Sequence, residues 1–84
     1  MEEKLIGKIT HYFNRIGVAV LELSDEIRVG DTIHIKGHTT DFTQKVVSMQ
    51  IEHKPIEVGK PGDNIAIKVD DVVKEHDLVF KVIE

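Results

Sequence analysis

The chain has 84 residues, a formal net charge of −4 at pH 7 and no cysteine. This length suits a single domain over residues 1–84 with little apolar area to spare for a deep substrate cavity, so a binding module is expected rather than an enzyme. The absence of cysteine excludes disulfides, thiolate nucleophiles and cysteine-based metal sites, and the net acidity disfavours a protein that binds nucleic acid mainly by neutralising phosphates.

The first third of the chain is expected to form two strands. Residues 5–13 are rich in β-branched and aromatic side chains, and alternation places Ile9, His11 and Phe13 on one face. After a polar break, Val18–Leu23 is apolar on nearly both faces, which is typical of a central strand.

A small turn device then occurs twice in clear form. Gly30-Asp31 precedes the segment TIHIK, and Gly62-Asp63 precedes the segment NIAIK. Glycine tolerates positive φ at a turn, aspartate can bond neighbouring backbone N–H groups, and an isoleucine at every second position then faces one side of a sheet. His76-Asp77 resembles a third, eroded copy of the same device.

The middle of the chain is expected to hold the longest strand, Phe42–His53. Its apolar residues, which include Val47, recur with period 2 rather than 3.6, so a strand is favoured over a helix. The following stretch, Lys54–Lys60, is expected to be a loop because Pro55 and Pro61 cannot sit inside a paired central strand.

Two further strands, Ile65–Val69 and Leu78–Ile83, complete a set of six or seven short strands with turns roughly every ten residues. No long helical segment is available to carry a parallel crossover, so the pattern predicts an all-β fold. At this size, closure removes the sheet edges that invite aggregation. We therefore predict a single closed, antiparallel, Greek-key-type β-barrel.

The order of motifs resembles the second domain of translational GTPases such as elongation factor Tu and the initiation factors. The resemblance rests on these segments: Gly7–Ile9, Gly17–Val20, Ile27–Ile33, Lys45–Gln50, Pro61–Ile67 and Asp77–Val79. It implies a six-stranded translation-protein barrel, often extended by a short strand, that contacts ribosomal RNA, aminoacyl-tRNA or a neighbouring GTPase domain. The chain lacks a phosphate-cradling Gly-x-x-x-x-Gly-Lys-Ser/Thr loop, so no nucleotide is expected to bind.

A similar barrel also resembles the small C-terminal domain of some collagenase-like peptidases, which are linked to RNA modification. That relative shares the short first loop around Asn14-Arg15 and lacks a GTPase neighbour. The resemblance implies a second expectation, namely the detached accessory domain of a larger enzyme.

Two groups of side chains are candidates for binding RNA or a partner. If the strands from Asp31 and from Phe42 pair as a hairpin, their outward side chains would form a basic, histidine-rich ribbon, although lysines also cover the outside of any barrel. The ribbon would consist of His34, Lys36, Lys45, His53 and Lys54. The second candidate is His11, Tyr12 and Arg15, where an exposed tyrosine beside arginine suits base stacking, or where the tyrosine instead closes one end of the barrel.

Neither a metal nor a cofactor is expected, because the five histidines do not show the spacing of converging ligands. Catalysis by paired carboxylates is not expected either, since the sequence shows neither a cleft nor a carboxyl group with a raised pKa. No apolar run approaches the roughly 18 residues of a membrane span, and the acidic start Met1–Lys4 differs from a secretory signal, so a cytoplasmic location is expected.

Two functional hypotheses follow. The first, favoured by the family resemblance, is a non-catalytic module that contacts RNA or a ribosome-associated complex in translation. The second, favoured by the net acidity, is a protein–protein adaptor or accessory domain, and it predicts an apolar patch around Ile16, Phe42 or Ile56.

Overall fold

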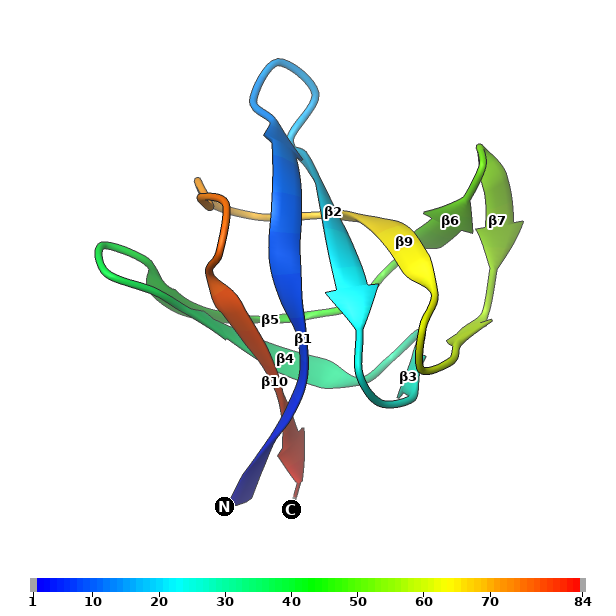
Figure 1. Cartoon of the computed structure of the whole chain (residues 1–84), viewed down its shortest axis with the longest axis horizontal. Helices are drawn as coiled ribbons and strands as arrows, with labels where there is room; N and C mark the ends of the chain where they lie inside the picture. The colour runs from blue at the N-terminus through cyan, green and yellow to red at the C-terminus, as the bar shows by residue number, and fades with distance from the viewer. Residues whose placement is uncertain (1, 84) are drawn as a thin grey trace.

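The structure, a computed structural model, describes residues 2–83. Its ten strands are β1 (Glu2–Phe13), β2 (Val18–Leu23), β3 (Ile27–Arg28), β4 (Thr32–Lys36), β5 (Asp41–Lys45), β6 (Met49–Ile51), β7 (Lys54–Ile56), β8 (Val58–Gly59), β9 (Asn64–Lys68) and β10 (Leu78–Ile83). Eight of them form one antiparallel sheet in the order β5-β4-β10-β1-β2-β9-β6-β7, and β3 pairs with β8 in a separate ribbon (Figure 1). The predicted all-β fold is confirmed.

The prediction of a closed barrel is wrong. The large sheet ends at β5 on one side and at β7 on the other, and within residues 2–83 no strand ladder joins these edges. Between β5 and the end of β9, a side chain takes the place of a strand ladder. The Nε2 group of Gln44 donates to the Lys68 carbonyl at 2.8 Å, and its Oε1 accepts from the Asp70 N–H at 2.7 Å. Gln44 is only 6% exposed, whereas Lys68 and Asp70 are exposed residues, so the bridge runs from a buried side chain to the surface.

The large sheet curls around the core, which is built almost wholly from isoleucine, valine and leucine. Alternation supplies most of it, since Ile33 and Ile35 of β4 and Ile65 and Ile67 of β9 all point inward and are buried. The expected inward direction of the β4 isoleucines is confirmed. Burying β-branched side chains of this size contributes about 1.5–3 kcal/mol each to folding, which is the main source of stability in a chain without disulfides.

The expected long strand Phe42–His53 is broken. β5 ends at Lys45, the link at residues 46–48 carries the chain from one edge of the sheet to β6 beside β9, and Glu52 and His53 form a two-residue turn with φ of 51° and 65°. Positive φ at both positions is the geometry of a type I′ hairpin turn. Alternation continues from Gln44 to Val47 and slips at Ser48, which is exposed like Val47 before it. Val47 is therefore 68% exposed, whereas Met49, expected on the same face, is buried.

Two other local expectations also differ from the structure. The stretch 54–60 holds the short strands β7 and β8, and Pro55 is tolerated because β7 is an edge strand. In β1 a register shift between Ile9 and His11 inserts an extra residue, as in a β-bulge. Tyr12 therefore packs against the core, while His11 and Phe13 face solvent, which reverses the predicted faces at this end of the strand.

The repeated turn device is present three times with the same bonds. The aspartate N–H donates to the carbonyl three residues earlier, at 3.1 Å for Asp31, 3.0 Å for Asp63 and 3.2 Å for Asp77. The same aspartate's carboxylate accepts the N–H of that earlier residue at 2.9, 3.0 and 2.9 Å, respectively. The residue before each aspartate has positive φ, with values of 97° at Gly30, 90° at Gly62 and 75° at His76. The third copy is therefore structurally complete although its glycine is missing.

Replacing His76 by glycine is expected to stabilise the protein. The left-handed backbone at this position costs an L-residue roughly 1–2 kcal/mol, and glycine removes this cost. The greater entropy of glycine in the unfolded chain offsets part of that gain, so a net increase of about 0.5–1 kcal/mol in unfolding free energy is expected. Urea denaturation of the His76→Gly variant measures this. The control Lys74→Gly, where φ is not positive, should lower stability, and a loss of stability in His76→Gly would contradict the prediction.

Candidate functional site

The predicted hairpin of β4 and β5 is present, with Thr32 opposite Lys45 and Lys36 opposite Asp41. His34, Lys36 and Lys45 lie on its outer face, because the alternate residues of β4 are the buried isoleucines. His53 and Lys54 do not join them, since they lie at the β6–β7 turn, on the opposite side of the strand order. The five residues of the predicted basic ribbon are thus split between two hairpins.

The imidazole of His34 is held between two carboxylates from other strands. Its Nδ1 lies 2.8 Å from Glu3 Oε2 on β1, and its Nε2 contacts Asp41 Oδ1 at the start of β5. The bond to Asp41, reinforced by that to Glu3, raises the pKa of His34 against the opposing effect of burial, and the same bond lowers the pKa of Asp41. The side chain is 15% exposed. His34 is therefore engaged within the protein rather than offered to a phosphate.

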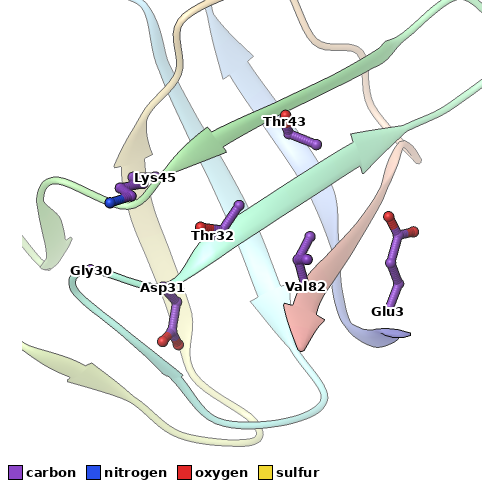
Figure 2. Close-up of a pocket in the computed structure, with 7 residues that line it drawn as sticks. All are labelled: Glu3, Gly30, Asp31, Thr32, Thr43, Lys45 and Val82. Carbon is purple, nitrogen blue, oxygen red and sulfur yellow. The ribbon is translucent and has the colours of Figure 1, made fainter. Parts of the chain in front are cut away.

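A groove of about 520 Å³ crosses the outer face beside this cluster (Figure 2). It is lined by Glu3, Gly30, Asp31, Thr32, Thr43, Lys45 and Val82. In Figure 2, Glu3 and Val82 stand on the β1–β10 side, and Lys45 lies at the other end beyond the two threonines. The groove therefore presents the carboxylates of Glu3 and Asp31 and the ammonium group of Lys45. This is a mixed-charge surface rather than the basic track that a nucleic acid backbone requires.

The second candidate group lies at the projecting hairpin that joins β1 to β2 (Figure 1). The His11 and Phe13 rings meet edge to face with centroids 4.3 Å apart, and His11 Nδ1 lies 3.8 Å from Glu75 Oε1. Tyr12 is half-buried against the core, while Arg15 is exposed in the turn. The structure thus brings His11 and Arg15 to one end of the molecule, but it packs Tyr12 inward.

The tip of this hairpin exposes two apolar side chains, Phe13 and Ile16, on a turn closed by backbone hydrogen bonds. The N–H groups of Ile16 and Gly17 both donate to the Phe13 carbonyl, at 3.3 and 3.0 Å, and Gly17 has the positive φ of 65° that closes such a turn. Ile16 is 63% exposed and Phe13 is 46% exposed. Turn chemistry favours Gly, Asn, Asp and Ser at such positions, so it does not account for an exposed isoleucine here.

Of the three residues expected to mark an apolar patch, only Ile16 is exposed; Phe42 and Ile56 pack against the core. Phe13 was not expected in the patch, because the bulge that turns it outward leaves no local sequence signal. Among residues 2–83, no three histidine, aspartate or glutamate side chains are placed to hold a metal ion. The described part of the chain also contains no helix with the length and apolar character needed to cross a membrane.

Comparison with known proteins connects the chain to peptidases. No family model matches it. It is 40% identical over 76 residues to an uncharacterised protease of Methanocaldococcus jannaschii, covering 89% of this chain and 19% of that protein. It is 35% identical over 82 residues to a collagenase of Porphyromonas gingivalis, covering 95% of this chain and 23% of the collagenase. The chain thus spans about a fifth of the length of these relatives.

The fold is also that of a peptidase-associated domain. The crystal structure of the C-terminal domain of a Geobacillus thermoleovorans putative U32 peptidase superposes with a TM-score of 0.89 at 20% identity, covering 94% of this chain and 92% of that one. Its selenomethionine variant gives a TM-score of 0.86 at 19% identity, covering 90% of this chain and 96% of that one.

These comparisons confirm the expected similarity to the C-terminal domains of collagenase-like peptidases. The predicted likeness to the second domain of elongation factor Tu is not supported, and the expectation of an RNA-binding translation module is wrong. The physical reason is that turn devices feeding short alternating strands specify local structure only. They are compatible both with a closed translation barrel and with the open sheet observed here.

Proposed function

We propose that this chain is a non-catalytic accessory domain that docks onto a larger U32 peptidase-like protein. The observation that carries the proposal is the sequence match: nearly the whole of this chain aligns with a segment that makes up about a fifth of the length of each relative named protease or collagenase. The structural relative is likewise a C-terminal domain determined separately from its peptidase. A domain of this size that serves a larger enzyme needs a surface that holds it in place.

The apolar tip of the β1–β2 hairpin supplies such a surface. Ile16 and Phe13 are exposed on a turn that backbone bonds hold in one shape, and a hollow of about 250 Å³ lies among residues 12–16. Exposed apolar side chains on a preordered element bind a partner with little loss of conformational entropy. Arg15 beside them gives the polar rim that typical interfaces have around an apolar centre.

The docking proposal predicts that Ile16→Asp weakens binding at least about tenfold, because a charge would replace an apolar side chain at the interface centre. The partner is the Porphyromonas gingivalis collagenase with the 82-residue matched segment deleted, and calorimetry measures the dissociation constant. The intact collagenase, whose own segment fills the site, should bind weakly or not at all.

The matched control is Val47→Asp, since Val47 is as exposed as Ile16 but lies in the link between β5 and β6. This variant should bind like the unmodified chain. Equal binding by Ile16→Asp and the unmodified chain would refute docking through the hairpin tip. Failure of the chain to bind the truncated collagenase would refute the accessory role itself.

A further inference from the structure

The cluster of Glu3, His34 and Asp41 joins three strands through one titratable ring. Glu3 lies near the start of β1, Asp41 opens β5, and His34 lies on β4 between them. An ionised carboxylate can only accept hydrogen bonds, so both ring nitrogens of His34 must donate for both contacts to be satisfied. Only the protonated imidazolium has two N–H groups.

We propose that His34 is a proton-controlled clasp that holds the beginning of β1 against the β4–β5 hairpin and releases Glu3 when the ring loses its proton. The neutral imidazole keeps one N–H. This stays on Nε2 because Asp41 lies on β5, which pairs directly with β4, whereas Glu3 reaches the ring from β1 across β10. The Nδ1 lone pair then faces the Glu3 carboxylate, and two acceptors in contact repel each other. This inference does not depend on the proposed accessory role.

The groups facing His34 support this direction of the switch. Glu3 on β1 and Asp41 on β5 both favour the charged ring, and Lys36, the next outward residue of β4, acts on Asp41 rather than on the ring. From β10 the neighbour is Phe80, uncharged, with its ring centroid 6.5 Å away. The raised pKa of His34 reflects the same two carboxylates, with Asp41 the larger cause.

The sign of the pH dependence follows from these shifts. Because the folded pKa of His34 is raised, its contribution to stability is complete below the ordinary histidine value of about 6.5 and is lost as the pH rises through the folded pKa. Because the pKa of Asp41 is lowered, its contribution is present above the ordinary aspartate value of about 3.9 and is lost as the pH falls through the folded pKa. The clasp is therefore most effective in mildly acidic solution.

Release of Glu3 also changes a surface. Glu3 lines the outer groove together with Lys45 and Asp31. While His34 is protonated, it pairs with the Glu3 carboxylate. When the ring is neutral, this carboxylate is free to act within the groove. The charge presented by this face of the sheet thereby becomes more negative as the pH rises.

Two measurements on the full chain test the clasp. NMR titration of the ring nitrogens should show a higher His34 midpoint in the unmodified chain than in Glu3→Gln or Asp41→Asn. Amide hydrogen exchange, expressed as protection factors, should show a several-fold loss of protection at Glu3 and Lys4 as the pH passes that midpoint. The neighbour variant Glu2→Gln, on the opposite face of β1, should leave both results unchanged.

Each measurement can overturn the inference. An identical His34 midpoint in the unmodified chain and in Glu3→Gln would show that Glu3 does not hold the ring. Protection at Glu3 and Lys4 that stays constant across the midpoint would show that the proton does not control the start of β1. The hydrogen-exchange measurement uses only the unmodified chain, so a variant that folds poorly does not block the test.

Discussion

A Gln44→Leu variant is expected to lose about 2–3 kcal/mol of unfolding free energy, because it removes both hydrogen bonds that the buried amide makes, to the Lys68 carbonyl and the Asp70 N–H. Leucine has nearly the same volume, so the loss reports hydrogen bonding rather than a cavity. The bridge joins the β5 edge to the end of β9, where the sheet has no backbone ladder. Thermal unfolding should show a midpoint lower by roughly 10–20 °C.

The matched control is Gln50→Leu, since Gln50 is an exposed residue of β6. Exposed substitutions usually change stability by no more than about 0.5 kcal/mol, so this variant should unfold close to the unmodified chain. Equal stability of the two variants would show that the Gln44 bridge does not hold β5 to the end of β9.

A Gly37→Ala variant is expected to lose about 2–3 kcal/mol, because the new methyl group would overlap the carboxylate of Asp77. Asp77 is buried, and its other oxygen accepts the Lys74 N–H at 2.9 Å in the third turn. Displacing the carboxylate therefore breaks a bond that the turn requires. Chemical denaturation gives the change in unfolding free energy, and the dependence of that free energy on denaturant concentration should be the same in both proteins.

A double-mutant cycle separates this steric cause from a general intolerance at position 37. In an Asp77→Ala background the methyl group meets no carboxylate, and φ at Gly37 is not positive, so Gly37→Ala should become neutral or slightly stabilising. A coupling energy of about 2 kcal/mol is expected. Additive losses in the double variant would contradict the proposed overlap.

The local parts of the fold were predictable because local chemistry specifies them. The Gly30-Asp31 and Gly62-Asp63 turns follow from glycine's access to positive φ and from the reach of an aspartate carboxylate to an N–H three residues earlier. The inward isoleucines of β4 and β9 follow from strand alternation. The β4–β5 hairpin, which carries part of the candidate site, was predictable for the same reasons.

The functional residues were only partly predictable. His34 is predicted as an outward basic residue, but its two carboxylate partners are not predicted. Glu3 lies 31 positions away in the sequence, and Asp41 meets the ring only through the pairing of β4 with β5. The exposure of Phe13 depends on the bulge after Ile9, which a plain count of alternating residues does not detect. Ile16 was expected in an apolar patch, and its exposure agrees with that expectation.

The sequence by itself determined an all-β chain, its three aspartate turns and most of its inward side chains, because φ preferences and period-2 alternation act within a few residues. Only the tertiary structure decided that the sheet stays open, that the expected long strand breaks at residues 46–48 and that His34 joins two carboxylates. Each of these depends on groups far apart in the chain, such as Gln44 and Asp70, 26 positions apart. Their meeting is set by how the whole sheet curls, which no short segment encodes.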